Sequence, residues 1–318
     1  MEVGTRTLDI LSSVLNEEVC LPELYERINK VMASHPTYSW RLIICDNGSV
    51  DSSWKIIQDL AESDSRVLGI RMSRTFGLDE AFTCGLDLAT ADAAVIMASD
   101  LQDPPEVIHN FLEKFEEGYE QVVAKITSRE TVPFVRRIMS NAFYQLANKM
   151  TKNVIPKGVS DFRLLSRPAY LAARSLRERH RFLRGLIAWT GFKTAEVEIE
   201  RPPRFGGDSK FVAIKFSVTI QWAFGAIFAH TAAPLIWVSV IGVFFSVVSA
   251  LATAVLSIFW IFKGVPFAGF GTIVGFVCLG FSLVLLSIGV IAQYIALIYE
   301  EVKGRPIYII AQRTDERK

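Results

Sequence analysis

Cysteine is scarce in this sequence, and its four copies share no motif. Cys20, Cys45, Cys84 and Cys278 form no C-x-x-C pair, and Cys278 lies inside an apolar run. Zinc sites and disulfide-stabilised folds need cysteines that are more closely spaced or more numerous. We therefore expect reduced, partly buried thiols rather than a zinc centre or a disulfide framework.

A surplus of charge of either sign is also absent. The chain has 34 basic and 33 acidic residues, which gives a formal net charge of +1. A balance of this kind gives no indication of nucleic-acid binding, and we expect no nucleic acid among the partners. The N-terminus lacks the basic stretch and long apolar core of a signal peptide, and residues 7–15 instead predict a first strand.

Glycine-rich phosphate loops are the third missing feature. Neither G-x-x-x-x-G-K-[ST] nor G-x-G-x-x-G occurs in the chain. Both motifs hold phosphate groups through backbone N–H groups that approach the ligand closely. A phosphate-bearing ligand of this protein is therefore not expected to bind in a cradle of that kind.

Charge is missing altogether from two long segments near the C-terminus. Residues 231–262 and 264–299 contain no charged side chain, and Lys263 alone separates them. About 20 apolar residues cross the hydrocarbon core of a bilayer, so each segment is long enough to span it. One continuous span would bury Lys263 at a cost of roughly 3 kcal/mol. We therefore predict two transmembrane helices, over about 231–262 and 267–299; the alternative is a buried helical hairpin in a soluble core.

Positive charges flank the predicted helices on their outer sides. Arg201, Arg204, Lys210 and Lys215 precede the first helix, and Lys303, Arg305, Arg313, Arg317 and Lys318 follow the second. The positive-inside rule therefore predicts a multi-pass protein of the cytoplasmic membrane, with both termini and the polar part of the chain in the cytoplasm. Residues 209–230 fit either an amphipathic segment at the membrane interface or an ordinary domain helix.

Short apolar strands alternate with amphipathic helices in the N-terminal part. The strands are predicted at 7–15, 40–45, 66–72, 93–98 and 120–126. This alternation is typical of an α/β domain with a Rossmann-like, mostly parallel sheet and helices on both faces. The predicted organisation is this domain at 1–208, the interfacial segment at 209–230, the two transmembrane helices within 231–299, and a cytoplasmic tail at 300–318.

Acidic and amide side chains follow three of the predicted strands. They are Asn16, Glu17 and Glu18 after the first, Asp46, Asn47 and Asp51 after the second, and Asp100, Gln102 and Asp103 after the fourth. Ligands of such sheets bind beyond the carboxyl ends of the strands. Carboxylates beside a diphosphate need a divalent cation, and oxygen ligands suit Mg²⁺ or Mn²⁺. Any one of these loops could be a plain turn with a helix cap, but three at successive strand ends favour a ligand site.

Six short motifs, in order along the chain, resemble a known family. They are NEE at 16–18, DNGSVDSS at 46–53, SRTFG at 73–77, SDLQDPPE at 99–106, SDFRLLSR at 160–167 and RFGGDSKF at 204–211. With the tail at 289–310, they are similar to the family 2 inverting glycosyltransferases of GT-A fold. The resemblance is to the polyisoprenyl-phosphate branch, which includes bactoprenol glucosyltransferases and dolichol-phosphate mannose synthase.

The resemblance implies a reaction and its participants. A sugar, glucose from UDP-glucose by analogy, would pass from a nucleotide-sugar to polyprenyl (undecaprenyl) phosphate with inversion, using Mg²⁺ or Mn²⁺. The product would serve cell-envelope glycosylation. The small residues Gly271, Gly275 and Gly280 in the second apolar segment would permit close helix contact, so we also expect a homo-oligomer.

The resemblance also implies roles for individual residues. Nucleotide-sugar binding falls to Leu15, Glu17, Asp46, Asn47, Asp51 and Asp100, and the metal to Asp100 and Gln102. Asp161 matches the acidic residue at the reacting centre. Binding of the acceptor phosphate falls to Arg136, Ser140, Arg163, Arg204, Ser209 and Lys210.

Four positions depart from the family pattern, and all would face the donor. Ala98 and Asn47 replace aspartates, and Ser13 and Leu15 replace a proline and a tyrosine. These changes leave open a catalytically weak or inactive member that serves as a membrane assembly or regulatory subunit. Two further alternatives are a processive polysaccharide synthase, whose Q-x-x-R-W motif is not found, and a transporter component.

Overall fold

The computed structural model describes residues 6–128, 158–179, 181–203, 205–206 and 269–316, together with isolated positions between 235 and 262. The chain divides into two compact units. One consists of Met1–Lys215 with Arg305–Lys318, and the other is Phe216–Gly304. Each unit is described by itself below.

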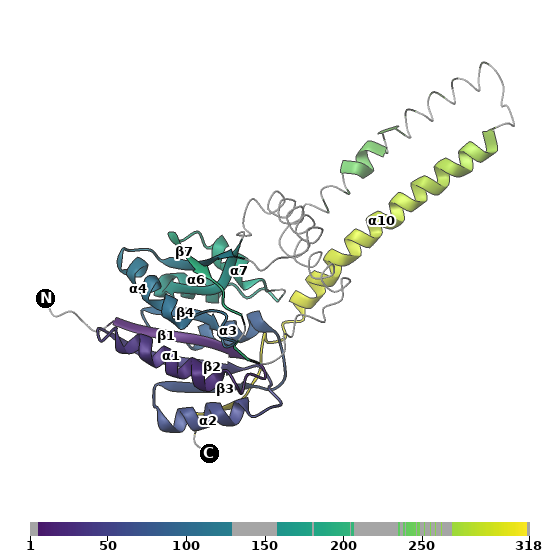
Figure 1. The fold of residues 1–318 in the computed structure, drawn as a ribbon. Helices are drawn as coiled ribbons and strands as arrows, with labels where there is room; N and C mark the ends of the chain where they lie inside the picture. Colours follow the sequence, from purple (N-terminus) through teal and green to yellow (C-terminus); the bar gives the residue numbers. More distant parts are fainter. Residues whose placement is uncertain are drawn as a thin grey trace. The chain divides into compact units, whose positions relative to one another are not determined.

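The first unit is built on a mixed sheet of eight described strands in the order β7-β5-β6-β4-β1-β2-β3-β8 (Figure 1). These strands are β1 (Arg6–Val14), β2 (Tyr38–Asp46), β3 (Val67–Met72), β4 (Ala93–Ala98), β5 (Gln121–Ser128), β6 (Val159–Ser166), β7 (Thr194–Glu200) and β8 (Ile310–Arg313). The central strands β1 to β4 run parallel, while β6 is antiparallel to both β4 and β5. The α/β class and the mostly parallel sheet are confirmed, and the predicted boundaries of β1 to β5 agree to within two residues.

Helices cover both faces of this sheet. The described helices of the unit are α1 (Leu21–Ala33), α2 (Ser53–Ser63), α3 (Leu78–Leu88), the 3₁₀ turn η1 (Pro105–Val107), α4 (Ile108–Glu116), α6 (Arg167–Ser175) and α7 (Leu183–Trp189). One apolar cluster joins the sheet to α1, α2 and α4, and a second joins it to α3, α6 and α7. Residues of β1 alternate between the two clusters, because successive side chains of a strand point to opposite faces.

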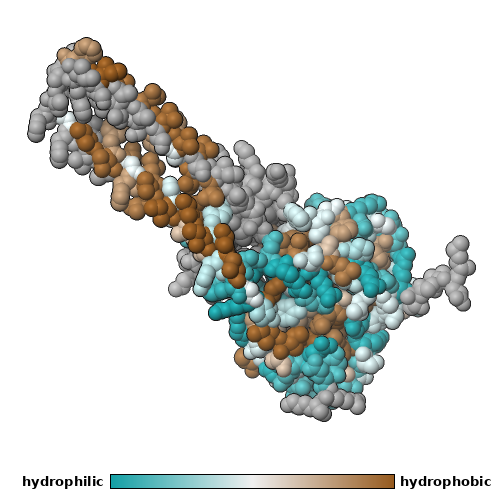
Figure 2. Space-filling model, turned by 180° about the vertical axis from the view of Figure 1, so that it is seen from behind, coloured by the Kyte–Doolittle hydropathy of each residue, from teal (hydrophilic) through white to brown (hydrophobic). Residues whose placement is uncertain are grey.

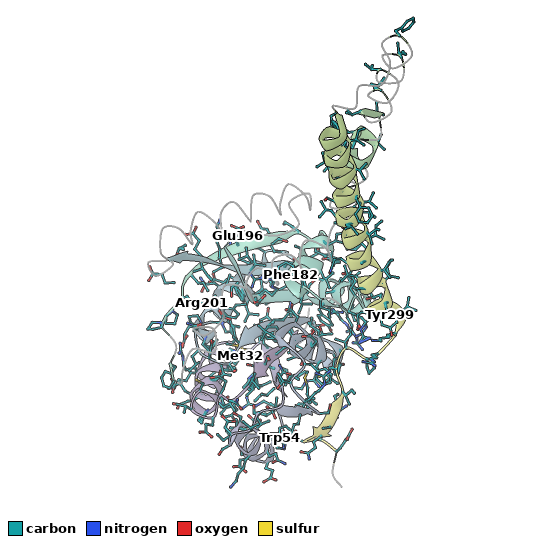
Figure 3. The ribbon with its side chains drawn as sticks, turned by 90° about the vertical axis from the view of Figure 1, so that its right-hand side faces the viewer. Met32, Trp54, Phe182, Glu196, Arg201 and Tyr299 are labelled. Atoms are coloured by element: carbon teal, nitrogen blue, oxygen red, sulfur yellow. The ribbon has the colours of Figure 1, made fainter. Side chains whose placement is uncertain are left out.

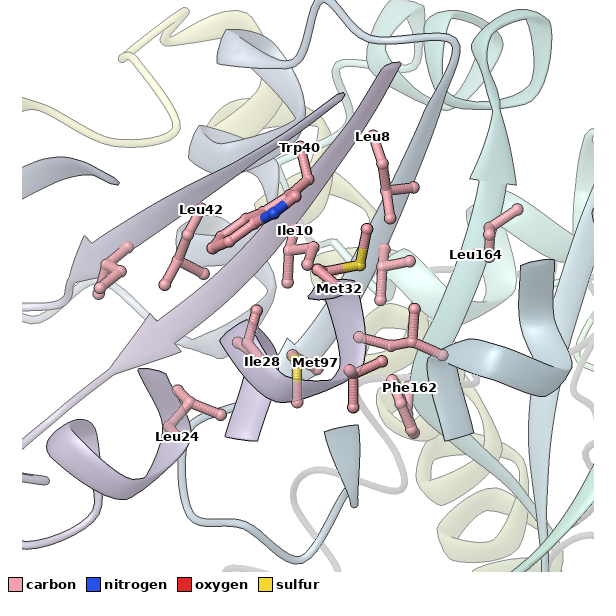
Figure 4. Close-up of a cluster of buried hydrophobic side chains, with 14 of the residues drawn as sticks. Leu8, Ile10, Leu24, Ile28, Met32, Trp40, Leu42, Met97, Phe162 and Leu164 are labelled. Carbon is pink, nitrogen blue, oxygen red and sulfur yellow. The ribbon is translucent and has the colours of Figure 1, made fainter. Parts of the chain in front are cut away.

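The first cluster shows how the sheet is stabilised (Figure 4). Leu8 and Ile10 of β1 and Leu42 of β2 are at most 1% exposed, and α1 covers them with Leu24 and Ile28. Burying a side chain of this size contributes about 1.5–3 kcal/mol. The strands are therefore held firmly, and the loops at their ends are carried on a rigid support.

The second unit contains α10 (Phe270–Val302), a helix of 33 residues. Its segment Leu279–Val302 contains an 18-residue stretch with a mean hydropathy of 2.3, and none of that stretch is buried. Apolar residues line the visible side of this helix, whereas the visible face of the sheet unit mixes hydrophilic and hydrophobic residues (Figure 2). By length and composition, α10 is the one helix within the described part of the chain that could cross a membrane. The other predicted helix, at 231–262, and the interfacial segment at 209–230 lie largely outside the described residues.

The chain returns from α10 to the edge of the sheet. Strand β8 pairs antiparallel with β3, with Arg313 opposite Ile70. The backbone N–H of Gly69 donates to the Thr314 hydroxyl at 2.9 Å, and the Tyr308 hydroxyl donates to the Asp87 carboxylate at 2.8 Å. The segment at 300–318, predicted only as a tail, thus contains an edge strand of the first unit.

Candidate functional site

The predicted site loops lie together at the end of the sheet where the parallel strands β1, β2 and β4 finish. Val14, the last residue of β1, is opposite Asp46, the last of β2, and Ser13 is opposite Ala98, the last of β4. Strand β6 runs the other way, with Arg163 opposite Ile96, so its beginning at Ser160 and Asp161 lies beside the end of β4. The loops predicted to bind the nucleotide-sugar and the predicted catalytic aspartate therefore lie at the same end of the sheet.

Direct hydrogen bonds join the loops after β1 and β2. The backbone N–H of Asn16 donates to the Ser49 hydroxyl at 2.9 Å, and that of Val50 donates to the Asn16 side-chain oxygen at 2.8 Å. Further along, the Glu17 N–H donates to the Ser53 hydroxyl at 2.9 Å, and the Asp51 carboxylate accepts from the N–H of Glu18 at 3.2 Å. The two loops therefore form one continuous surface. Leu15 is half-buried between β1 and this surface.

Asp46 is wholly buried at the end of β2. Its Oδ1 accepts from the N–H of Ser49 at 2.9 Å. Its Oδ2 lies 3.5 Å from Nε of Arg71 and has no hydrogen-bond partner within the described parts of the chain. Arg71 also reaches the Ser49 carbonyl and lies over the ring of Trp54. A buried carboxylate oxygen that accepts no hydrogen bond from the protein can accept one from a ligand.

Asn47 uses its side chain to hold the loop that follows β3. Its Nδ2 donates to the Gly77 carbonyl, and its Oδ1 accepts from the N–H of Phe76, both at 2.9 Å. Its neighbour Gly48 has φ +82°, and a Cβ there would lie 2.8 Å from the backbone of Thr75. The close approach of the two loops therefore requires glycine at this position.

Backbone strain marks two of the loops. Asn16 and Leu101 adopt φ of 52° and 60°, in the left-handed region that is rare for a residue such as leucine. Leu101 separates the two predicted metal ligands, and the Asp100 carboxylate accepts from the N–H of Gln102 at 3.2 Å. Strain of this kind is concentrated at functional sites.

The donor set around Asp100 suits a metal ion that is shared with a substrate. No cluster of three His, Cys, Asp or Glu side chains capable of holding a metal occurs among the residues that the structure describes. Mg²⁺ is commonly held by one or two carboxylates together with substrate phosphates and water. The Asp100 carboxylate and the Gln102 amide oxygen fit that arrangement, in which a diphosphate would complete the coordination.

Asp161 is held by an arginine that the sequence analysis missed. Arg184, on α7, donates to its two carboxylate oxygens from Nε at 3.0 Å and Nη2 at 2.7 Å. Burial works to raise the pKa of Asp161, but the hydrogen bonds from Arg184 and the nearby charges of Arg163 and Arg201 outweigh it and lower the pKa. The Asp161 carboxylate is therefore ionised and fixed in orientation.

Arg163, predicted to bind the acceptor phosphate, is almost fully buried. Its guanidinium donates to the backbone carbonyls of Ser160 at 2.9 Å and Asp161 at 3.2 Å. Burial lowers the pKa of Arg163 to about 10, with a smaller opposing effect from Asp161. Its positive charge remains next to Asp161, although these hydrogen bonds serve the backbone.

A second carboxylate lies close to this pair. Asp79, in the first turn of α3, accepts a hydrogen bond from the backbone N–H of Leu183. Burial and the charge of Asp161 raise the pKa of Asp79 to about 7, despite the opposing hydrogen bond and the positive charge of Arg184. The pKa of Asp79 therefore lies near neutral pH.

A buried ion pair connects the Asp100 loop to β6 and β7. Asp103 is wholly buried, and its Oδ1 accepts from Arg201 Nη2 at 2.8 Å and from the Ser160 hydroxyl at 3.3 Å. Arg201, labelled in Figure 3, directly follows β7. It also donates to the Ser160 hydroxyl at 3.2 Å. Three segments that are distant in sequence therefore meet at one carboxylate.

Five predicted acceptor residues cannot be placed in this geometry. Arg136, Ser140, Arg204, Ser209 and Lys210 lie outside the described residues. The functional candidates that the sequence analysis missed are Arg71, Asp79, Arg184 and, as a site residue, Arg201. No motif marks them, since each acquires its partner only through packing between distant elements.

Comparison with known proteins agrees with the predicted family. The family model described as glycosyl transferase family 2 matches residues 9–172. The bactoprenol glucosyl transferase of Shigella phage SfX is 36% identical over 310 residues, which cover 96% of this chain and 99% of that protein. The uncharacterized glycosyltransferase YkcC of Bacillus subtilis is 35% identical, over 95% of this chain and 92% of its own.

Solved structures give a more distant similarity. Glucosyl-3-phosphoglycerate synthase from Mycobacterium tuberculosis, solved with Mn²⁺, UDP and phosphoglyceric acid, is 16% identical with a TM-score of 0.48. That similarity covers 70% of this chain and 77% of the synthase. The family model and the near full-length relatives are decisive: the chain belongs to glycosyltransferase family 2.

Proposed function

We propose that this protein transfers a sugar from a nucleotide-sugar to a polyprenyl phosphate, with inversion, and that the donor is UDP-glucose. The observation that carries the proposal is the common end of the sheet at which Asp46, Asp100 and Asp161 lie. Donor loops and a fixed carboxylate at one place are what a reaction between a nucleotide-sugar and a second substrate requires. Similarity to bactoprenol glucosyl transferases over nearly the whole chain supports the choice of acceptor and sugar.

In this reaction an oxygen of the acceptor phosphate forms a bond to the anomeric carbon. The bond from that carbon to the diphosphate breaks on the opposite face, and a nucleoside diphosphate leaves. A phosphate monoester with a second pKa of about 6 is largely ionised near neutral pH, so the nucleophile needs little help from a base. Asp161, ionised and fixed by Arg184, would orient the acceptor phosphate or the sugar rather than remove a proton.

The donor would bind across the joined loops after β1 and β2. The Asp46 Oδ2, which forms an ion pair with Arg71, would accept a hydrogen bond from the nucleoside. Leu15, Glu17 and Asp51 would line the same part of the pocket. Asn47 would act by holding the neighbouring loop. Asp100 and Gln102 would hold Mg²⁺ or Mn²⁺, which neutralises charge on a leaving diphosphate.

The proposed acceptor, a polyprenyl phosphate, would explain why the catalytic unit is joined to an apolar segment. A polyprenyl chain stays in the bilayer, so the site must work at the membrane surface. We propose that α10 and the segment at 231–262 form a transmembrane hairpin in the cytoplasmic membrane, with the catalytic unit in the cytoplasm and hairpins associating into a homo-oligomer. Arg136, Ser140, Arg204, Ser209 and Lys210 would add to the binding of the acceptor phosphate.

Transfer of radiolabelled sugar from a panel of nucleotide-sugars to undecaprenyl phosphate in detergent tests the proposal. We expect a glycolipid from UDP-glucose with Mg²⁺ or Mn²⁺ and none with EDTA. The variant Asp161→Asn is the negative control, and Lys125→Gln, which alters an exposed ion pair with Glu196, is the positive one. Folded protein that makes no glycolipid from any donor would overturn the proposed reaction.

One observation favours a second function. Ala98 provides no carboxylate at the end of β4, and the Asn47 amide is occupied by the loop after β3. A member with a weakened donor site could serve instead as a membrane assembly or regulatory subunit. Calorimetry would decide, because such a subunit would bind no nucleotide-sugar with either metal ion.

A further inference from the structure

Asp103 closes the loop at 98–103, called the metal loop below, which contains both proposed metal ligands. Its Oδ2 accepts a hydrogen bond from the backbone N–H of Ala98, the last residue of β4, at 3.4 Å. Asp100 and Gln102 lie between these two residues, and Leu101 between them has a φ of 60°. A backbone conformation of this kind persists only where surrounding contacts hold it. Asp103 provides such a contact, because it ties the end of the metal loop to its beginning.

The other oxygen of the same carboxylate holds the beginning of β6. Asp103 Oδ1 accepts from the Ser160 hydroxyl at 3.3 Å, and the Ser160 oxygen accepts from the backbone N–H of Phe162 at 3.2 Å. Asp161 lies between Ser160 and Phe162, which are 2% and 0% exposed. The residues on both sides of Asp161 are therefore buried and connected to Asp103.

Arg201 supplies the opposite charge that this wholly buried carboxylate requires. Its Nη2 donates to Asp103 Oδ1 at 2.8 Å and to the Ser160 hydroxyl at 3.2 Å. A hydrogen bond that involves charged groups is about twice as strong as one between neutral groups. Arg201 therefore holds Asp103 and Ser160 together, and these three side chains form a bridge from the metal loop to β6.

We propose that Asp103 is a positioning residue that fixes the metal loop relative to Asp161, with Ser160 and Arg201 completing the bridge. The inference rests on the proposed function, which places the metal ion at Asp100 and the reacting centre at Asp161. The donor and the acceptor must be aligned on opposite faces of one carbon, and a misplacement of about 1 Å can lower a rate roughly 100-fold. Asp103 is wholly buried, so it acts through these neighbours rather than on a substrate.

Asp103→Asn tests both sides of the bridge. An amide has one acceptor oxygen, so this variant cannot accept from Ala98 and from Arg201 on separate oxygens. We expect the affinity for Mn²⁺ in the presence of UDP to weaken about 10-fold or more, and kcat to fall roughly 10- to 100-fold. Electron paramagnetic resonance of Mn²⁺, with the full chain in detergent, measures the affinity without any sugar transfer.

Glu106→Gln is the matched control for Asp103→Asn. Glu106 closely follows Asp103 in the chain, and its ion pair is with Arg27 of α1 rather than with the bridge. The same change from acid to amide should therefore leave the Mn²⁺ affinity and kcat at their wild-type values. Unchanged Mn²⁺ affinity or unchanged kcat in Asp103→Asn overturns the inference while leaving the proposed function standing.

Ser160→Ala breaks the bridge on the β6 side alone. The ion pair of Asp103 with Arg201 and the hydrogen bond from Ala98 remain, so this variant should fold even if Asp103→Asn does not. We expect kcat to fall roughly 10-fold, with the Mn²⁺ affinity and the KM for the donor unchanged. Wild-type kcat in Ser160→Ala would overturn the connection to Asp161.

A double variant distinguishes positioning from a general weakening of the fold. In the Asp161→Asn background, Ser160→Ala should lower kcat little further, because the carboxylate that it positions is gone. An equal effect in both backgrounds would show that Ser160 does not act through Asp161, and would overturn the inference. A wild type that binds no Mn²⁺ with UDP, or transfers no sugar, overturns the proposed function and the inference together.

Discussion

Asp161 and Arg184 face each other through two parallel hydrogen bonds of 3.0 and 2.7 Å. This pairing lowers the pKa of Asp161 despite its burial. A carboxylate with a lowered pKa is a weak base, so a role in orientation and electrostatics suits it better than proton removal. The proposed acceptor phosphate is already ionised and needs no base, so a role of Asp161 in orientation and electrostatics would be sufficient.

Replacing Asp161 should therefore damage the reaction more than donor binding. We expect Asp161→Asn to lower kcat at least about 100-fold, because it removes a fixed charge at the proposed reacting centre. Binding of UDP, measured by calorimetry, should stay within a few-fold of wild type, since Asp46 and Glu17 are untouched. Full turnover in this variant would contradict the role assigned to Asp161.

Asp79 should make stability depend on pH. Its pKa is about 7 in the folded protein and 3.8 ordinarily, so the folded state binds the proton more tightly. The resulting destabilisation is absent below about pH 4, grows as the pH rises, and is complete above pH 7. Asp79→Asn removes it, so the melting temperature should rise several degrees over wild type at pH 8 and less at pH 5. An increase that is equal at both pH values would argue against a raised pKa.

The ion pair of Asp103 and Arg201 should contribute strongly to stability. Arg201→Met would leave the wholly buried Asp103 carboxylate without its charged partner, a change that costs roughly 3–5 kcal/mol. Asp103→Asn combined with Arg201→Met should recover part of that loss, because no buried charge then remains. Chemical unfolding followed by tryptophan fluorescence gives these values. A double variant no more stable than Arg201→Met alone would show that the lost contacts, not the buried charge, dominate.

The framework and the donor side of the site were predictable from local sequence. Strands β1 to β4 are short apolar runs, and their loops are polar where the carboxyl ends of parallel strands meet. Strand β6 was missed because it contains two charged residues, Asp161 and Arg163, and the partner of Asp161 comes from α7. Strand β8 was missed because it has only four residues and is stabilised by pairing with β3, far away in the sequence.

The electrostatic part of the site was not predictable for a similar reason. The chain positions of Asp79 and Arg184 give no sign that α3 and α7 bring them to the same carboxylate. Asp103 lies in a predicted site loop, but nothing in the sequence indicates that Arg201 is its partner. Such roles arise from packing between distant segments and need three-dimensional structure to be seen.

Asn47 provides a last test, because the resemblance described above implies aspartate at this position in the family. The Asn47 amide donates to the Gly77 carbonyl and accepts from the Phe76 N–H. In Asn47→Asp the hydrogen-bond donor Nδ2 is replaced by an oxygen, which then faces the Gly77 carbonyl oxygen. The Asn47 residue is only 3% exposed, so water cannot easily relieve this repulsion. We expect a loss of about 1–3 kcal/mol in the free energy of unfolding at pH 8, and a smaller loss at low pH, where a protonated aspartate can donate again. Unchanged stability at pH 8 would mean that the loop after β3 adopts another arrangement, in which this residue is released to face the donor.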